Sequence, residues 1–552
     1  MRSTQDGRWS HRVLPGESSQ GIGKRMTKLV EVRDLSVAFG DTTVVQRISF
    51  DIDAGETVAL VGESGSGKTV TALSIPQLLP YPYASHPTGS VLLDGEEMIG
   101  AGSSKLLAMR GSVVSMIFQE PMTSLNPLHK IGKQVSEMLL LEKHLTRRGA
   151  SERVRELFDL VGLDESVRIG AYPHELSGGQ RQRVMIAMAL AQEPKLLIAD
   201  EPTTALDVTI QKQILQLLRD LQERLNMALL LISHNLTVVR SLAQRICVMT
   251  HGEIVEQNTS RRIFGAPQHA YTKHLLGAEF MDLPPPAARH APVVAEVENL
   301  HVRYALGRHW FGKQRFLDAV VGVSLKIREG HTVGIVGESG SGKTTLGMAL
   351  LRMIPSEGRI VAIGRELHAL NKKQMKPLRQ DLQVVFQDPY GSLSPRMTVG
   401  RIVGEGLRIH SGDVPIGERE QQVADALIEV GLEPDMMNRY PHEFSGGERQ
   451  RISIARALVV KPKLIVMDEP TSALDVSVQS QIVELLREVQ LRYNLVYLFI
   501  SHDLKVIRAL AHDLVVMHHG TVVEQGEARK IFESPKHEYT RTLMDAAFMR
   551  EL

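Results

Sequence analysis

Two segments of the chain have the residue types and spacing of a phosphate-binding loop. Both read Gly-Glu-Ser-Gly-Ser-Gly-Lys-Thr, at residues 62–69 and 337–344, between a strand-like apolar run and a helix-like run. The glycines let backbone N–H groups face a phosphate, the lysine reaches the β and γ phosphates, and the threonine hydroxyl holds Mg²⁺. Such a pattern arises by chance about 0.02 times in a chain of this length, so two copies predict two nucleotide sites. The predicted nucleotide contacts are Gly62, Ser64, Gly65, Ser66, Gly67, Lys68, Thr69 and Val70, and Gly337, Ser339, Gly340, Ser341, Gly342, Lys343, Thr344 and Thr345.

Acidic residues follow two further apolar runs of the sequence. Asp200 and Asp468 each end a predicted buried strand, where a carboxylate suits Mg²⁺, held through water. Glu201 and Glu469 come next and could polarise the attacking water as general bases. The alternative is a structural acidic pair in front of a proline.

A histidine follows a serine at the end of each of two other apolar runs. His234 comes after residues 228–232, and His502 comes after residues 496–500. A lone histidine is more often structural than functional. Two at equivalent positions, each at a strand end, predict contacts with the γ phosphate.

A serine and two glycines open a helix-like segment at residues 177–179 and again at 445–447. The first N–H groups of a helix have no partner within the helix and lie at the positive end of its dipole. They therefore predict a phosphate contact. The residues concerned are Ser177, Gly178, Gly179, Ser445, Gly446 and Gly447. The alternative for one copy alone is a serine N-cap after a loop.

The motifs repeat because the chain is one domain written twice. From Gln119 onward the two halves match at a fixed offset of 268 residues. We expect domains at residues 27–281 and 295–552, joined by a stiff proline-rich linker at 282–294. Residues 1–26 are expected to be a disordered leader or a start-site artefact.

Alternating strand-like and helix-like segments in each half predict an α/β fold with a parallel sheet covered on both faces. Residues 128–176 and 395–444 are predicted to form an inserted helical subdomain. The net charge of the 552 residues is +1, which does not suggest a nucleic-acid surface. The single cysteine, Cys247, excludes disulfides within the chain and four-cysteine metal sites, and its apolar surroundings predict a buried thiol. No apolar run approaches the ~18 residues of a membrane span.

With these motifs in the same order in both halves, the sequence resembles ATP-binding cassette ATPases from about residue 27 onward. The resemblance implies two tandem P-loop NTPase domains that bind ATP and Mg²⁺. Each would have a mostly parallel sheet core, an antiparallel β subdomain and an inserted helical subdomain. It also implies that Phe39 and Tyr304 stack on adenine, and that Gln119 and Gln387 sense Mg²⁺ and the attacking water. Residues 205–207 and 473–475 would link the two sites.

In this family the Ser-Gly-Gly stretch of one domain closes over the ATP held by the other. The resemblance implies a first site of Lys68, Thr69, Gln119, Asp200, Glu201 and His234, capped by residues 445–447. The second would be Lys343, Thr344, Gln387, Asp468, Glu469 and His502, capped by residues 177–179. Mg²⁺ would be held by Thr69, Gln119 and Asp200, and by Thr344, Gln387 and Asp468. Phe444 and Glu448 depart from the commonest signature outside its core, so two active sites are expected.

Among transporters, the sequence resembles the ATPases of dipeptide and oligopeptide importers, the peptide/nickel group. The cues are the loops themselves, residues 118–127 and 386–395, and the closing His-x-Tyr-Thr segments at 269–272 and 537–540. Ala270 and Glu538 stand where the family usually has proline.

The resemblance implies an ATP-hydrolysing, energy-coupling subunit at the cytoplasmic face of the bacterial inner membrane. Its partners would be two permeases, docked on the loops after Gln119 and Gln387, and through them a periplasmic solute-binding protein. The solute would be a dipeptide, an oligopeptide or a microcin C-like peptide, with glutathione and nickel as alternatives. The rival class is a soluble tandem ATPase that acts on ribosomes or DNA. The short linker and single cysteine favour transport.

Overall fold

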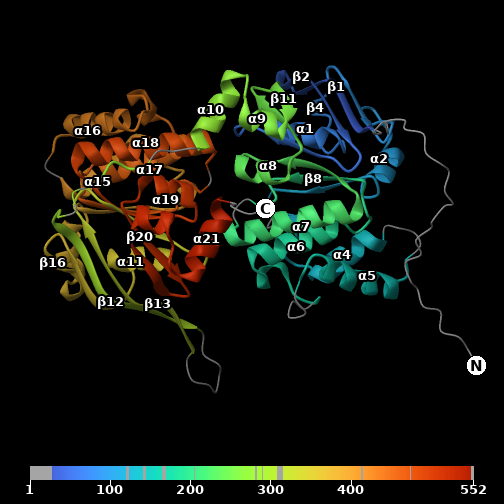
Figure 1. Cartoon of the computed structure of the whole chain (residues 1–552). Coiled ribbons are helices and arrows are strands. Elements are labelled where there is room, and N and C mark those ends of the chain that lie inside the picture. The colour runs from blue at the N-terminus through green and yellow to red at the C-terminus, as the bar shows by residue number, and fades with distance from the viewer. Residues whose placement is uncertain are drawn as a thin grey trace, which may run out of the picture.

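The computed structural model shows the two halves of the chain as two α/β units that lie side by side (Figure 1). The structure describes residues 28–119, 124–140, 145–163, 169–203, 206–279, 283–286, 288, 290–306, 315–411, 414–472 and 474–548. The expected leader, residues 1–26, lies outside this part of the chain, as do the alanines at 205 and 473 in the expected linking loops.

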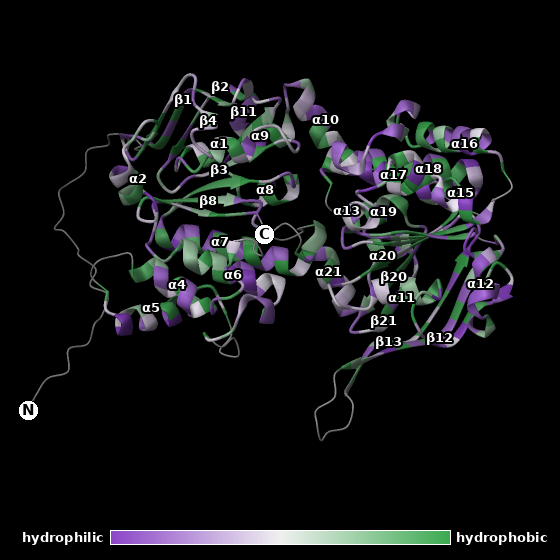
Figure 2. Cartoon of the chain, turned by 180° about the vertical axis from the view of Figure 1, so that it is seen from behind, coloured by the Kyte–Doolittle hydropathy of each residue, from purple (hydrophilic) through white to green (hydrophobic). Residues whose placement is uncertain are grey.

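A six-stranded sheet forms the core of the first half. Its order is β11-β10-β3-β9-β8-β7, and only the β10–β11 pair is antiparallel. The strands are β3 (Thr57–Val61), β7 (Val114–Ile117), β8 (Leu196–Asp200), β9 (Ala228–Ile232), β10 (Arg245–Thr250) and β11 (Glu253–Thr259). Every residue of β3, β8 and β9 is buried, which explains their continuous apolar sequences (Figure 2). Cys247 is buried in β10, as predicted.

A smaller antiparallel sheet, of order β2-β1-β5-β6, accompanies this core, and β4 pairs with β1 beside it. Its strands are β1 (Lys28–Phe39), β2 (Thr42–Asp53), β4 (Ala84–Ser85), β5 (Ser90–Leu93) and β6 (Glu96–Glu97). The predicted antiparallel subdomain is therefore present in the first half.

The second half repeats both sheets in the same order. Its core sheet runs β21-β20-β14-β19-β18-β17, and its antiparallel sheet runs β13-β12-β15-β16. The core strands are β14 (Thr332–Val336), β17 (Leu382–Val385), β18 (Leu464–Asp468), β19 (Val496–Ile500), β20 (Asp513–His518) and β21 (Thr521–Glu527). The others are β12 (Val293–Leu306), β13 (Arg315–Arg328), β15 (Glu357–Ala362) and β16 (Arg365–Glu366). The equal strand order confirms the predicted fold class.

Helices cover the sheets in both halves. In the first half they are α1 (Lys68–Ser74), α2 (Ser103–Met109), α4 (Ile131–Leu140), α5 (Arg147–Leu160), α6 (Gly178–Ala189), α7 (Val208–Leu225), α8 (Leu236–Leu242), α9 (Ser260–Gly265) and α10 (Ala270–Glu279). In the second they are α11 (Lys343–Leu350), α12 (Lys372–Leu378), α13 (Pro389–Ser392), α14 (Val399–Val403), α15 (Glu405–His410), α16 (Ile416–Glu429), α17 (Gly446–Leu458), α18 (Val476–Tyr493), α19 (Leu504–Leu510), α20 (Ala528–Glu533) and α21 (Glu538–Phe548). Helices α4 and α5, and α14 to α16, form the predicted inserted subdomains. No helix among the described residues is long and apolar enough to cross a membrane.

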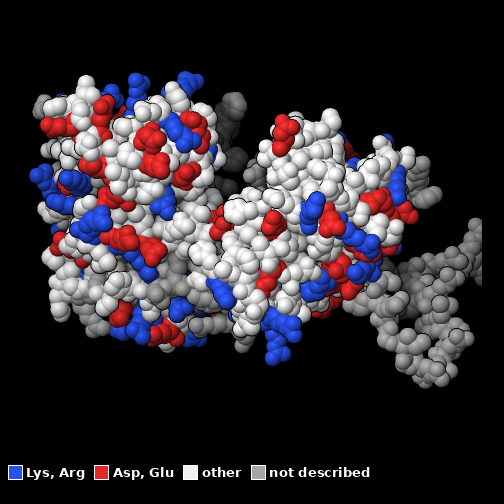
Figure 3. All heavy atoms as spheres, turned by 90° about the horizontal axis from the view of Figure 1, so that it is seen from above, with Lys and Arg blue, Asp and Glu red and all other residues white. Residues whose placement is uncertain are grey.

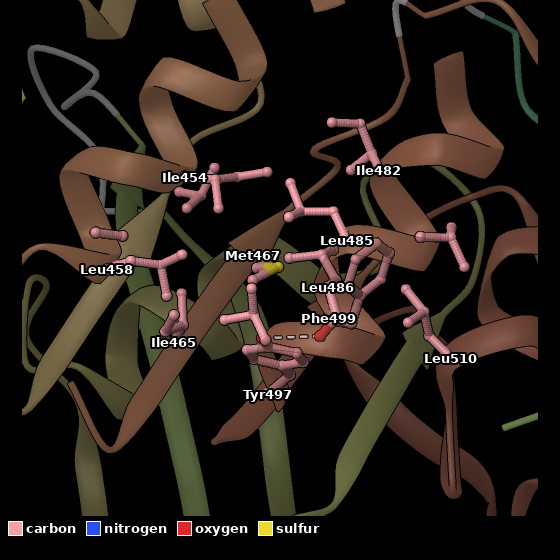
Figure 4. Close-up of a cluster of buried hydrophobic side chains, with 14 of the residues drawn as sticks. Ile454, Leu458, Ile465, Met467, Ile482, Leu485, Leu486, Tyr497, Phe499 and Leu510 are labelled. Atoms are coloured by element: carbon pink, nitrogen blue, oxygen red, sulfur yellow. Dashed lines mark hydrogen bonds between the residues drawn. The ribbon is translucent and has the colours of Figure 1, made fainter. Parts of the chain in front are cut away.

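The core of the second half is packed between β18, β19 and the helices α17, α18 and α19 (Figure 4). Tyr497 and Phe499 are its largest fully buried side chains. The Tyr497 hydroxyl donates to the Leu486 carbonyl oxygen at 3.1 Å, which satisfies the one polar group of that side chain.

Two helices cross between the halves. Helix α10 of the first half packs on α18 of the second, and α21 of the second half packs on α7 of the first (Figure 1). Between the halves, the chain from Leu283 follows the second half, where His512 Nε2 lies 3.1 Å from the Pro285 oxygen. Strand β12 begins at Val293, so it takes in the last two residues of the expected linker.

Candidate functional site

The phosphate loops lie where β3 passes into α1 and where β14 passes into α11. Gly62 has a φ of 153°, and an added Cβ would lie 2.1 Å from the Met249 carbonyl oxygen. Only glycine allows this approach of the first loop to the end of β10. Lys68 Nζ donates to the carbonyl oxygens of Gly62, at 2.8 Å, and Glu63, at 2.7 Å. The lysine is thus folded back into its own loop.

The second loop has the same geometry. Lys343 Nζ donates to the Gly337 oxygen at 2.9 Å and to the Glu338 oxygen at 2.8 Å. Burial lowers the pKa of Lys343, and the carboxylate of Glu469 is the strongest opposing influence. Burial lowers the pKa of Lys68 as well. Because burial disfavours the charged form of each lysine, an anion that binds beside it would stabilise that charge.

A threonine hydroxyl and an aspartate meet beside each loop. Thr69 Oγ1 donates to Asp200 Oδ1 at 3.3 Å, and Thr344 Oγ1 donates to Asp468 Oδ1 at 2.9 Å. Both aspartates are the last residues of buried strands, as the sequence predicts. Burial raises the pKa of Asp200 to about 6 and also raises the pKa of Asp468. Hard oxygen donors in this arrangement fit Mg²⁺, whose charge would favour the ionised carboxylates.

Each predicted general base is held by two other predicted residues. In the first half, Gln119 Nε2 donates to Glu201 Oε2 at 2.9 Å, and His234 Nδ1 donates to Glu201 Oε1 at 2.8 Å. Glu201 has a φ of 47°, an uncommon backbone conformation for a residue that is not glycine. Such strain persists only where the surroundings fix it, and it gathers at functional sites.

The second half repeats this group. Gln387 Nε2 donates to Glu469 Oε2 at 2.8 Å, and His502 Nδ1 lies 3.2 Å from the same oxygen. Glu469 has a φ of 46°. Burial works to raise the pKa of Glu469, but the His502 hydrogen bond and charge outweigh it, and the pKa is lowered. The lowered pKa keeps Glu469 ionised, as a general base must be before it takes a proton.

The two expected adenine-stacking residues have different surroundings. Tyr304 lines a cavity of about 950 Å³ together with Lys343, Thr344 and Gln387. Phe39 lies 5.8 Å, between ring centroids, from Tyr83. Tyr83 belongs to a loop that the second half lacks in the aligned sequence.

The Ser-Gly-Gly segments open helices α6 and α17, with Ser177 and Ser445 as N-caps. Ser177 Oγ accepts from Gln180 N at 3.3 Å, while Gln180 Oε1 accepts from Ser177 N at 2.9 Å. The N-cap interpretation therefore applies to both copies. The cavity of the second site is lined by Gly446 of its own half, and residues 177–179 are not among its lining residues. Capping by the opposite half stays a prediction.

An aspartate from each half reaches the phosphate loop of the other. Asp475 accepts from Ser64 N at 3.1 Å and from Ser64 Oγ at 2.8 Å. Asp207 Oδ1 accepts from Ser339 N at 2.7 Å. These aspartates are the described ends of the two expected linking loops, and each immediately precedes a helix, α18 or α7.

Two tyrosines that the sequence did not indicate as site residues also contact the loops. Tyr271 Oη accepts from Glu63 N at 3.1 Å, and Tyr539 Oη accepts from Glu338 N at 3.0 Å. Each is the tyrosine of a His-x-Tyr-Thr segment, and its repetition at the offset of 268 was the sequence signal that could have identified it as a site residue. The distance in sequence from the loops hid the contact.

The fold and these two equivalent groups define a P-loop nucleotide-binding protein with two sites. Residues 45–204 and 320–472 match the ABC transporter family, and residues 523–550 match the family described as the C-terminal region of oligopeptide/dipeptide transporters. The chain belongs to the ABC transporter family, and it is an ATP-binding ATPase.

Relatives cover nearly the whole chain. A peptidoglycan transport ATP-binding protein, YejF, of Agrobacterium fabrum is 57% identical over 94% of this chain and 96% of its own. The YejF ABC transporter ATP-binding protein of Escherichia coli K12 is 50% identical, over 94% and 99%. A glutathione import ATP-binding protein, GsiA, of Pectobacterium atrosepticum is 44% identical, over 94% and 89%. They confirm the resemblance to fused importer ATPases.

Proposed function

We propose that the chain hydrolyses ATP at two sites to drive import of peptides across the bacterial inner membrane. The observation that carries the proposal is the group of glutamate, glutamine and histidine beside each phosphate loop, with the same pairing of residues in both halves. The match of residues 523–550 to oligopeptide/dipeptide transporters and the peptidoglycan transport relative support a peptide as the solute.

In the first site, Glu201 takes the proton of the attacking water. Its two carboxylate oxygens are held by Gln119 and His234, so the base keeps one orientation. Lys68 leaves the carbonyl oxygens of its loop for the phosphates. Mg²⁺, held by Thr69, Gln119 and Asp200, would neutralise the charge that develops on the phosphates. Catalysis is then positioning and electrostatic stabilisation, as phosphoryl transfer requires.

The second site uses the equivalent residues, with Glu469 as base. Phe39 and Tyr304 provide stacking surfaces for the two adenines. ATP binding brings the halves together, with residues 445–447 over the first ATP and residues 177–179 over the second. The cross-half contacts of Asp475 and Asp207 with the phosphate loops support a coupled pair of sites.

An ABC importer ATPase works with membrane permeases. We therefore place this chain at the cytoplasmic face of the inner membrane, docked on two permeases through the loops after Gln119 and Gln387. A periplasmic solute-binding protein would deliver the peptide. On the face shown in Figure 3, basic and acidic side chains are interspersed, which offers no support for the ribosome- or DNA-acting class.

Glutathione is the second candidate solute, because a glutathione import protein is 44% identical over most of the chain. The two candidates are separated by reconstituting the chain in proteoliposomes with its permeases and binding protein. We expect an oligopeptide such as microcin C to stimulate ATP hydrolysis and glutathione to have no effect. Stimulation by glutathione alone would replace the peptide proposal.

The catalytic assignment is tested with the double variant Glu201→Gln and Glu469→Gln in the full chain. We expect it to bind ATP normally and to hydrolyse it at least about 100-fold more slowly, because a general base contributes about 10²–10⁴-fold. Glu152→Gln, on the exposed surface of α5, is the matched control and should hydrolyse ATP at the wild-type rate. Near-normal turnover in the double variant would contradict the assignment.

The capping across halves is tested with Ser177→Arg, whose bulk would block a phosphate contact. We expect hydrolysis at the second site to be lost while each half still binds nucleotide. Ser103→Arg, at the exposed first position of α2, is the control substitution of the same type. Unchanged hydrolysis in Ser177→Arg would show that α6 does not close over the second ATP.

A further inference from the structure

The closing His-x-Tyr-Thr segments contact the phosphate loops in a way that the proposed mechanism does not use. Each is built in the same way. His269 N and Gln268 N both donate to the Glu256 carboxylate, at 3.0 and 2.9 Å, and Tyr271 N donates to His269 Nδ1 at 3.2 Å. The segment is therefore fixed to strand β11, and it sets the direction in which the tyrosine points.

The second segment repeats these contacts. His537 N and Lys536 N donate to the Glu524 carboxylate, each at 3.0 Å, and Tyr539 N donates to His537 Nδ1 at 3.2 Å. Thr540, the last residue of the segment, is buried in the first turn of α21. Two copies with the same partners show a built arrangement rather than a chance contact.

Each tyrosine hydroxyl holds a peptide group that the loop lysine also uses. The Glu63 N–H donates to Tyr271, and the carbonyl oxygen of the same peptide group, that of Gly62, accepts from Lys68 Nζ at 2.8 Å. The next residue, Ser64, donates its N–H to Asp475 of the other half. Burial raises the pKa of Tyr539 to about 12, so its hydroxyl is neutral at physiological pH.

The same segments lead into the helices that cross between the halves. Tyr271 lies in the first turn of α10, which packs on α18, the helix that begins after Asp475. Tyr539 lies in the first turn of α21, which packs on α7, the helix that begins after Asp207 (Figure 1). Each phosphate loop is therefore connected twice to the helix α18 or α7 of the opposite half. The aspartate that precedes the helix contacts the loop directly, and the tyrosine connects the loop to that helix through α10 or α21.

We propose that Tyr271 and Tyr539 are positioning residues, each of which holds the start of its phosphate loop in register with the aspartate of the opposite half. The proposal rests on the proposed hydrolysis at these loops. Each tyrosine contacts the backbone of its loop through its hydroxyl. It fixes the loop that the aspartate contacts, so its loss would allow ATP to bind but would loosen the alignment of the two halves that hydrolysis needs.

The test is the double variant Tyr271→Phe and Tyr539→Phe in the full chain, which removes only the two hydroxyls. We expect kcat to fall about threefold to tenfold, the range for one neutral hydrogen bond, with KM for ATP changed less than about twofold. The Hill coefficient for ATP should fall as well, because the two loops lose a shared constraint.

Tyr497→Phe is the matched control. It removes a buried tyrosine hydroxyl bonded to the Leu486 oxygen, away from both loops, so it should lower the unfolding temperature and leave kcat unchanged. The proposal is overturned if the double variant keeps its kcat and Hill coefficient, or if kcat falls only as much as in Tyr497→Phe. The double variant Glu201→Gln and Glu469→Gln separates this proposal from the proposed function. If that variant still hydrolyses ATP, the proposed function fails. If it is inactive while the tyrosine variant hydrolyses ATP normally, only the tyrosine proposal fails.

Discussion

The replacement of Asp200 by asparagine should stabilise the ligand-free protein while abolishing hydrolysis. Asp200 is 3% exposed at the end of β8, and its hydrogen bond from Thr69 is long, at 3.3 Å. Burial raises the pKa of this carboxyl from 3.8 to about 6. When Mg²⁺ is absent, the ionised Asp200 carboxylate therefore lowers the free energy of unfolding.

The sign and size of the effect follow from the two pKa values. The folded state binds the Asp200 proton more tightly than the unfolded state, so stability falls as the pH rises from 3.8 to 6. At ~1.4 kcal/mol per pKa unit, the full cost above pH 6 is about 3 kcal/mol, and about half of it is present at pH 5. Asparagine has no charge, so Asp200→Asn removes this cost.

The assay is thermal unfolding of the full chain in EDTA at pH 8 and pH 5. For a domain of this size, about 3 kcal/mol corresponds to a rise of roughly 6–12 °C in the transition of the first half at pH 8. The rise should be about half as large at pH 5. With MgATP, the wild type should gain stability and Asp200→Asn should gain less.

Asp94→Asn provides the control, because Asp94 is exposed and its ion pair with Lys195 is a surface contact worth ~0–1 kcal/mol. It should change the unfolding temperature little, and equally at both pH values. If Asp200→Asn is no more stable than the wild type at pH 8, or if its advantage does not shrink at pH 5, the reasoning from burial is refuted.

Two further predictions concern His234 and Gly179. Burial lowers the pKa of His234, but the hydrogen bond and charge of Glu201 outweigh it, so the pKa is raised above 6.5. The His234–Glu201 pair therefore stabilises the fold fully below pH 6.5, and this stabilisation is lost as the pH rises through the raised pKa. His234→Gln should therefore cost more stability at pH 6 than at pH 9 in denaturant unfolding, and an equal cost would argue against a charged pair. A Cβ on Gly179 would lie 2.6 Å from Ile210 Cγ2, so Gly179→Ala should force α6 from α7 and destabilise the first half by about 1–3 kcal/mol. Gly265→Ala, with no atom within 4 Å of the added Cβ, should unfold like the wild type; a similar shift in both would contradict the packing argument.

The loops and their immediate surroundings could be predicted from the sequence because their chemistry is local. Strands β3 and β14 begin and end where the apolar runs do, and Lys68 and Lys343 follow in fixed loops. Glu201 and Glu469 were identified by their position one residue after a strand. The geometry adds that a glutamine and a histidine hold each of them, which sequence spacing cannot show because Gln119 lies 82 residues from Glu201.

The contacts between the halves were decided only by the tertiary structure. Asp207 and Ser339 are 132 residues apart, and Ser64 and Asp475 are 411 apart, so their pairing depends on how two whole domains pack. The same is true of Tyr271 and Tyr539, whose motif was visible but whose partners were not. The duplicated sequence by itself determined two copies of one fold and two predicted sets of site residues, because strand burial and loop chemistry depend on short-range patterns. Which loop meets which aspartate or tyrosine required the packing of α10 on α18 and of α21 on α7, a long-range property that no local pattern encodes.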